Sequence, residues 1–274
     1  MNGISGVAGN APFVALPPAS GRDDAPLVVV WHMLDAPRTE VAMSSALPLH
    51  EVDAWRVYLG LPLPPEAGDP VLGYFGPIVE RAVAEFPRAL DELNRQLPIG
   101  GRQVGPIGLV GASLSAMVVQ SLLAEADDIP VTSVALVSPV VQLTGLVQAS
   151  ERAYGMAYPW SDESRALAHR LDFVARAEDL AKRDVPILLV VGDGDDEGFT
   201  VPAERLWQAL SSLGEPGRYS LTTVPGMGHA LADEPGVDAA PQTPHAAQVD
   251  GIVSEWLNRS SPSSNRSSNR SSKK

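Results

Sequence analysis

The sequence predicts an α/β protein with a mostly parallel central sheet and helices on both faces. Short apolar runs of strand length alternate with longer segments whose apolar residues recur at helical spacing. These runs are apolar almost throughout, which is typical of strands buried on both faces of a parallel sheet. The chain has 274 residues, of which 45% are hydrophobic, so it can bury the core of a full-sized domain. We therefore expect one domain over residues 1–258.

The individual elements follow from this alternation. Strands are expected at the β-branched or apolar runs that Pro, Gly or Asp bound, namely 27–31, 55–59, 107–110, 131–137, 185–191 and 219–224, with a possible earlier strand at 11–16. Helices are expected where apolar residues recur every three or four positions, namely 71–97, 115–126, 203–213 and 246–258. No internal repeat is present.

Residues 139–184 interrupt the alternation. This segment is too long for a simple crossover between two strands. They predict several short helices, and they carry Tyr154, Tyr158 and Trp160 around a Gly and a Pro. An insertion at the carboxyl end of a strand can cover the ligand crevice of an open α/β sheet. We expect a short helical cap with these aromatic residues in contact with substrate. The alternative is a structural excursion whose aromatic residues pack only on the sheet.

Charge and composition limit the partners. The net charge is −13, although residues 259–274 hold five basic and no acidic side chains. An acidic surface repels phosphate backbones, so we expect no nucleic-acid partner but a small-molecule substrate. The tail 259–274 consists of Ser, Asn, Arg and Lys with a single Pro, and it is expected to be disordered. No apolar run is long enough for a membrane span and the N-terminus lacks the pattern of a signal peptide, which predicts a cytoplasmic protein. The sequence does not indicate the oligomeric state.

A turn of small residues connects the apolar run 107–110 to the following helix, with Ser113 at its apex. The turn reads Gly111-Ala112-Ser113-Leu114-Ser115 and resembles the nucleophile elbow of the α/β-hydrolase superfamily, Gly-x-Ser-x-Gly, with Ser115 in place of the second glycine. The resemblance extends over about residues 26–257 and implies that Ser113 is a nucleophile. Considered alone, a serine between a strand and a helix is more often an N-cap.

Two further loops resemble those that carry the acid and the histidine in this superfamily. Residues 190–196 follow an apolar run and contain Asp195 at the matching position, with Asp193 and Asp196 as competitors. Residues 224–229, Val-Pro-Gly-Met-Gly-His, end in His229. The order Ser113, Asp195, His229 is the one expected for this fold. The resemblance therefore implies a Ser-His-Asp triad, in which the acid orients and stabilises the imidazole.

The oxyanion hole is expected to use backbone N–H groups of Leu114 and of the loop after residues 27–31. Within that loop, Leu34 is the first choice and Met33 the second; Met33 stands where family members commonly have glycine after the histidine. His32 is expected to hold the loop by hydrogen bonds rather than to take part in the reaction. Leu34, Leu114 and Met227 predict an apolar acyl pocket, with Met227 in contact with substrate, although packing is their default role.

The resemblance implies a serine hydrolase that cleaves ester-like bonds of small to medium uncharged substrates through an acyl-enzyme intermediate. Thioesterase, peptidase and acyltransferase activities use the same triad and remain alternatives. A ligand-binding homologue with little turnover is another, because Met33 could block the oxyanion hole. We expect no cofactor and no catalytic metal, since the chain has no Cys and no cluster of His, Asp and Glu with convincing ligand spacing.

Overall fold

The computed structural model describes residues 3–22, 25–64, 68–98 and 105–260. Its strands are β1 (Ile4–Ala8), β2 (Ala11–Leu16), β3 (Leu27–Trp31), β4 (Trp55–Leu59), β5 (Ile107–Ala112), β6 (Val131–Val137), β7 (Ile187–Gly192) and β8 (Tyr219–Val224). Its helices are α1 (Glu40–Ala46), α2 (Gly76–Gln96), α3 (Ser115–Glu125), α4 (Leu143–Tyr154), α5 (Asp162–Arg170), α6 (Ala177–Ala181), α7 (Glu197–Leu213) and α8 (Pro244–Ser260), with a π-helical segment η1 (Pro70–Phe75) before α2.

Within the described residues, the strands form one sheet in the order β1-β2-β4-β3-β5-β6-β7-β8. The pairs from β4 to β8 are parallel, and β1 and β2 add an antiparallel edge. Every residue of the central strands β3 and β5 is buried, as the apolar runs predict. At the far edge β8 is partly exposed, because no further strand covers it. The predicted α/β class and the mostly parallel sheet are confirmed.

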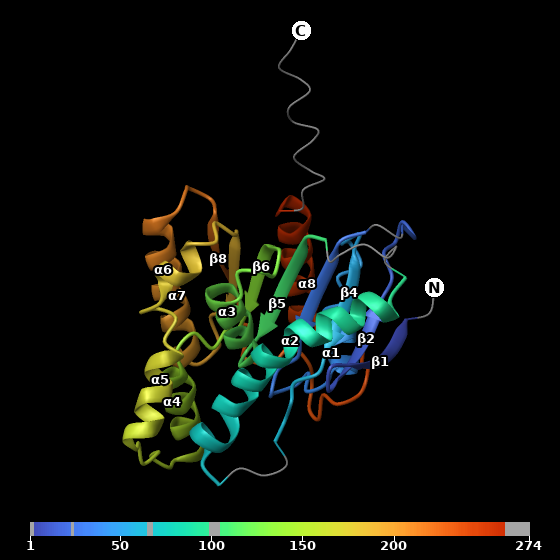
Figure 1. Ribbon diagram of the computed structural model, residues 1–274. Coiled ribbons are helices and arrows are strands. Elements are labelled where there is room, and N and C mark those ends of the chain that lie inside the picture. The colour runs from blue at the N-terminus through green and yellow to red at the C-terminus, as the bar shows by residue number, and fades with distance from the viewer. Residues whose placement is uncertain (1–2, 23–24, 65–67, 99–104, 261–274) are drawn as a thin grey trace.

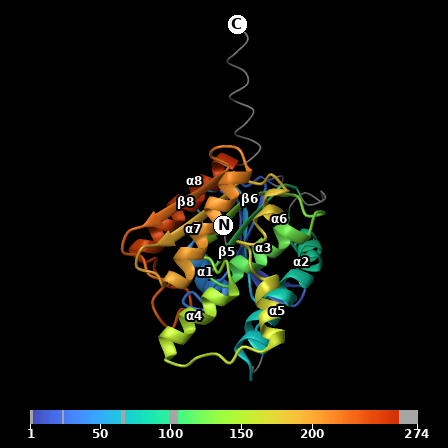
Figure 2. The ribbon, with the colours of Figure 1, turned by 90° about the vertical axis from the view of Figure 1, so that its left-hand side faces the viewer.

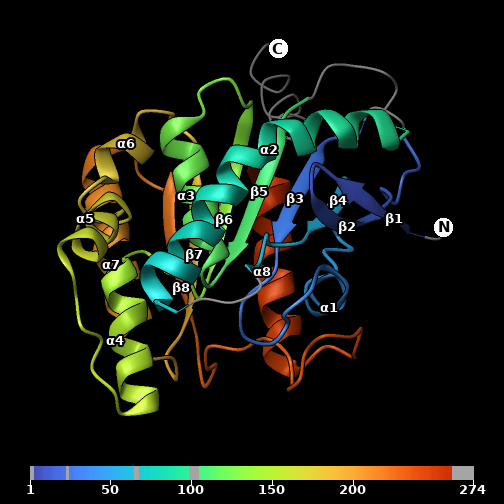
Figure 3. The ribbon, with the colours of Figure 1, turned by 60° about the horizontal axis from the view of Figure 1, so that its bottom comes forward.

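Helices cover both faces of the sheet (Figure 1). One hydrophobic cluster contains the buried sides of α2, α3, α6 and α7, and a second cluster on the opposite face contains α1 and α8. In Figure 3, α2 and α3 lie in front of the sheet and α8 lies behind it. Helices, sheet and helices thus form three layers. The loops at the carboxyl ends of the strands lie outside these layers, where they can form a site.

The insertion between β6 and β7 folds into the helices α4, α5 and α6. Figure 2 shows α4 and α5 at the lower end of the molecule. Helix α4 packs closely on α7, since a Cβ added at Gly145 would lie 2.2 Å from the carbonyl oxygen of Gly198. The expected short helices are present, and their role as a cap remains a proposal.

The structure corrects several predicted boundaries. Helix α7 begins at Glu197 rather than near Ala203, and α8 continues through Arg259 and Ser260, which the prediction assigned to the tail. The remainder of the predicted tail, 261–274, lies outside the described residues. Strand β1 and helix α1 were not predicted, because both are short and have weak periodicity.

Candidate active site

Ser113 lies on the sharp turn between β5 and α3, at the carboxyl edge of the sheet. Its φ of 53° belongs to the left-handed region, which a residue with a side chain adopts at a cost in conformational energy. The preceding Gly111 permits the turn: an added Cβ would lie 2.7 Å from the Ser115 carbonyl oxygen and 2.8 Å from the Ala116 Cα. The predicted elbow is therefore present, and Ser113 is not the N-cap of α3, since Leu114 occupies that position.

Ser115, which replaces the second glycine of the pattern, is buried, and its hydroxyl makes three polar contacts. Its Oγ accepts a hydrogen bond from the Ala112 N–H at 2.8 Å and lies 3.2 Å from the carbonyl oxygen of Trp31 at the end of β3. Its hydroxyl also lies 2.8 Å from the Ala112 carbonyl oxygen. Ser115 thus connects the elbow to the strand that leads into the predicted oxyanion loop.

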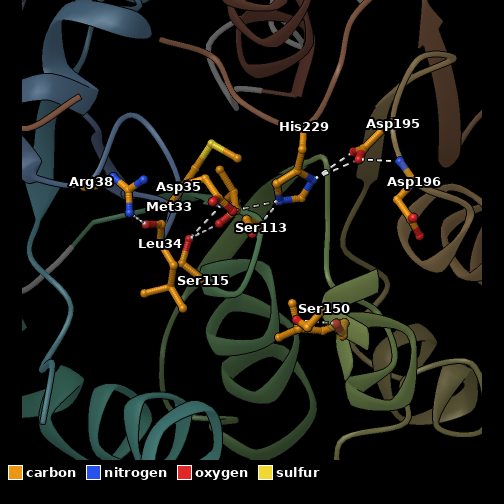
Figure 4. Close-up of polar contacts among 12 residues, drawn as sticks. Met33, Leu34, Asp35, Arg38, Ser113, Ser115, Ser150, Asp195, Asp196 and His229 are labelled. Carbon is orange, nitrogen blue, oxygen red and sulfur yellow. Dashed lines mark hydrogen bonds and ion pairs between the residues drawn. The ribbon is translucent and has the colours of Figure 1, made fainter. Parts of the chain in front are cut away.

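Three predicted residues from distant loops meet at the elbow (Figure 4). The Nε2 atom of His229 lies 2.8 Å from Ser113 Oγ. Its Nδ1 atom lies 2.9 Å from Asp195 Oδ2 and 3.2 Å from Oδ1. One imidazole therefore bridges a hydroxyl and a carboxylate, the arrangement by which a serine can be activated as a nucleophile.

The three aspartates of the β7–α7 loop have different partners. Asp195 faces His229, its side chain is only 1% exposed, and its Oδ1 accepts a hydrogen bond from the Asp196 N–H. Asp193 accepts a hydrogen bond from the Gly226 N–H, which supports the histidine loop. Asp196 forms a bidentate ion pair with Arg152 of α4, and this contact holds the pKa of Asp196 below its usual range. Of the three, Asp195 has the geometry that the prediction requires.

Phe199, which the sequence analysis did not identify, stacks on the His229 ring. The ring centroids are 4.1 Å apart and the planes differ by 28°. Phe199 lies in the first turn of α7, which begins earlier than predicted, so no local pattern pointed to this contact. The stacked ring restricts the rotation of the imidazole.

The loop after β3 is held by His32. The His32 Nδ1–H donates to the Met33 carbonyl oxygen at 2.7 Å, and Nε2 accepts from the Leu61 N–H at 2.9 Å. Burial lowers the pKa of His32 to about 4, so the ring is neutral at pH 7 with its single proton on Nδ1. Both nitrogens are occupied, which agrees with the expected structural role.

Leu34 and Met33, the predicted donors to an oxyanion, differ in the hydrogen bonds that their N–H groups make. The Met33 N–H donates to the Pro37 carbonyl oxygen at 3.1 Å and is engaged within the loop. Among the described residues, the backbone N–H groups of Leu34 and Leu114 donate no hydrogen bond. The Met33 side chain is buried at 0% exposure and packs in the cluster on the α1 and α8 face.

Arg38 connects this loop to the segment after His229. Its Nη1 donates to the Leu34 carbonyl oxygen at 2.9 Å, and its Nη2 donates to both carboxylate oxygens of Glu234 at 2.6 and 2.8 Å. The N–H of Leu231 adds a hydrogen bond to the Ala36 carbonyl oxygen at 3.0 Å. The loop before α1 and the loop after His229 are therefore held as one unit.

The predicted substrate-contact residues occupy different environments. Met227 is buried at 0% exposure in the α8-side cluster, where packing accounts for it. Tyr154 is 76% exposed at the end of α4. Tyr158 donates its hydroxyl to the Asp69 carboxylate at 2.8 Å, and the Trp160 ring packs edge-on against it, with centroids 4.9 Å apart. Tyr158 thus ties the α4–α5 connection to η1.

Over the residues that the structure describes, no helix is long and apolar enough to cross a membrane. Within the same residues, no three His, Asp or Glu side chains gather where they could hold a metal ion.

Comparisons with known proteins yield similarity in structure alone. No protein-family model matches the chain, and no curated protein sequence is significantly similar to it. Est1E from Butyrivibrio proteoclasticus superposes with a TM-score of 0.64 at 13% identity, over 95% of this chain and 99% of Est1E. Carboxyl esterase 2 from the fungus Tuber melanosporum superposes with a TM-score of 0.59 at 18% identity, over 94% of this chain and 85% of the esterase.

Pyrococcus horikoshii acylaminoacyl peptidase also superposes, with a TM-score of 0.61 at 14% identity. That match covers 94% of this chain but 41% of the peptidase, so the chain corresponds to one part of the larger enzyme. At such identities the similarity describes the fold. The sheet order, the elbow on β5 and these superpositions agree, and the chain has the α/β-hydrolase fold.

Proposed function

We propose that the protein is a serine hydrolase that cleaves ester-like bonds of small to medium substrates. The observation that carries the proposal is the continuous contact from Ser113 Oγ through His229 to the buried carboxylate of Asp195. The names of the superposed esterases and peptidase agree with hydrolysis of acyl bonds.

The reaction has two halves. His229 Nε2 accepts the Ser113 proton while Oγ attacks the carbonyl carbon, and the same nitrogen then donates that proton to the leaving alcohol. A water molecule replaces the alcohol, loses its proton to Nε2 and attacks the acyl carbon; the bond to Oγ then breaks, Nε2 returns the proton to Ser113 Oγ, and a carboxylic acid leaves. Asp195 stabilises the imidazolium that forms in each half.

The oxyanion of each tetrahedral intermediate is assigned to the N–H groups of Leu114 and Leu34. Both are without a hydrogen-bond acceptor among the described residues, and Leu114 lies at the N-terminus of α3, where the first N–H groups have no partner within the helix. Removing one such donor typically costs about 100-fold to 1,000-fold in kcat.

An active enzyme is favoured over a ligand-binding homologue by the position of Met33. The alternative depended on a Met33 side chain that blocks the hole, and that side chain is buried in the core. Thioesterase, peptidase and acyltransferase activities use the same residues, and no feature of the described residues favours one of them over ester hydrolysis.

A fluorophosphonate probe tests the proposal directly, because it reacts with an activated serine. We expect stoichiometric labelling of Ser113 by intact mass, and turnover of short p-nitrophenyl esters that falls at least about 10,000-fold in Ser113→Ala. Ser121→Ala keeps the nucleophile and removes another buried hydroxyl of α3, so it serves as the control. Absence of both labelling and Ser113-dependent turnover would contradict the proposal. A panel of matched ester, thioester and peptide substrates then ranks the alternatives.

A further inference from the structure

A carboxylate that the triad does not use lies beside the reacting atoms. The Oδ2 atom of Asp35 is 3.8 Å from His229 Nε2, the same atom that lies 2.8 Å from Ser113 Oγ. Figure 4 shows Asp35 on the oxyanion loop, directed toward Ser113 and His229. Its side chain is 54% exposed, so it is open to solvent as well as to the site.

No arginine or lysine neutralises Asp35 within the part of the chain that the structure describes; its only ion-pair partner there is His229. The two arginines that contact the loops of the site are engaged by other acids. Arg38 pairs with Glu234, and Arg152 pairs with Asp196. A cation that enters the site therefore meets a carboxylate without a fixed counter-charge.

The position of Asp35 identifies the part of the substrate that it faces. In the proposed reaction His229 Nε2 passes its proton to the leaving oxygen, so the leaving alcohol must come within hydrogen-bond distance of Nε2. Asp35 approaches the same nitrogen from the oxyanion loop. A substituent a few bonds from the leaving oxygen can therefore reach the carboxylate.

We propose that Asp35 determines specificity for esters whose leaving alcohol carries an ammonium group close to the ester oxygen. The inference rests on the proposed function and narrows it, replacing the expectation of uncharged substrates. Opposite charges a few ångströms apart attract, so the cationic substrate binds and reacts better. Alcohols that carry a carboxylate or phosphate are repelled. Because Asp35 is half exposed, the attraction decreases as salt is added.

An isosteric substrate pair isolates this charge. Butyrylcholine and 3,3-dimethylbutyl butyrate have the same shape, and differ by a quaternary nitrogen in place of a carbon. The released acid is followed in a pH-stat at low ionic strength. We expect kcat/KM to be about tenfold higher for butyrylcholine, which corresponds to about 1.4 kcal/mol, and the ratio to shrink at high salt.

The ratio of the two kcat/KM values is then compared between variants. In Asp35→Asn, which keeps the shape of the side chain and removes its charge, we expect the ratio to fall to the value that the intrinsic reactivity of the two esters sets, as measured from their hydrolysis by hydroxide. Asp127→Asn makes the same chemical change at an exposed turn after α3, at the opposite edge of the sheet, and should keep the wild-type ratio. Using a ratio removes any general effect of a variant on folding or on the triad.

Three results would overturn the inference while leaving the proposed function intact. The first is equal kcat/KM values for the two esters in the wild type. The second is an unchanged ratio in Asp35→Asn, and the third is a ratio that falls by the same factor in Asp35→Asn and Asp127→Asn. If neither ester is hydrolysed and the fluorophosphonate does not label Ser113, the proposed function itself fails and the inference falls with it.

Discussion

The two sides of the site are built in different ways. On one side, Ser113, His229 and Asp195 meet through their side chains. On the other side, the loop that begins at His32 is proposed to contribute a backbone N–H, and the position of that group depends on the residues that hold the loop. Side-chain chemistry requires particular residue types and so leaves a pattern in the sequence. Backbone chemistry is available to any residue except proline, which is why no residue type marks Leu34 as a donor.

The largest expected effect is on the side of the site where side chains meet. Asp195→Asn should lower kcat about 10,000-fold with little change in fold, because the amide cannot stabilise the imidazolium and favours the wrong tautomer of His229. Asp193→Asn is the matched control two residues away. Since Asp193 contacts the Gly226 N–H rather than the imidazole, we expect a loss of at most about tenfold. Steady-state kinetics on one ester compares the two, and similar losses would mean that the acid is wrongly assigned.

Substitutions of His32 test the other side of the site, where a backbone N–H is the proposed group. Its Nδ1–H fixes the carbonyl of the peptide whose N–H belongs to Leu34, and in a trans peptide these two groups point in opposite directions. His32→Ala should therefore lower kcat about 100-fold with KM changed about threefold or less. His32→Asn retains an N–H near the Met33 carbonyl and should lose only about tenfold.

A transition-state analogue separates positioning by His32 from general damage. Inhibition by a trifluoromethyl ketone should weaken across the His32 variants in proportion to their kcat/KM, since both depend on the oxyanion donors. Variants that lose stability but keep both kcat and inhibitor affinity would show that His32 supports the fold alone.

The smallest expected effect is the pH dependence of stability that the His32 side chain causes. The pKa of His32 is about 4 in the folded protein and near 6.5 when unfolded, so the unfolded chain binds the proton more readily. The free energy of unfolding is therefore highest above about pH 6.5, where His32 is neutral in both states. It decreases as the pH falls toward 4, by about 2 kcal/mol between pH 8 and pH 5. Urea unfolding at the two pH values measures it. His32→Asn lacks the titration, and an equal pH dependence in both proteins would contradict the assignment.

Local pattern was sufficient for most of the architecture. The predicted strands at 27–31, 55–59, 131–137 and 219–224 coincide with β3, β4, β6 and β8. Helix starts were predicted less well: α7 begins at Glu197, where the acidic loop gives no apolar periodicity and the Asp196 side chain caps the helix. Boundaries depend on such caps and on neighbouring elements more than on propensity.

The sequence by itself determined the strand and helix alternation and the three residues that we propose as a triad, because periodicity and motif spacing are local properties of the chain. Tertiary structure alone decided the contacts of Phe199, Arg38 and Asp35, and the burial of the Met33 side chain. Asp35 and His229 are separated by most of the chain, and their approach depends on how β3 and β8 lie in one sheet. Distances of this kind are set by the packing of whole layers, which no local pattern encodes.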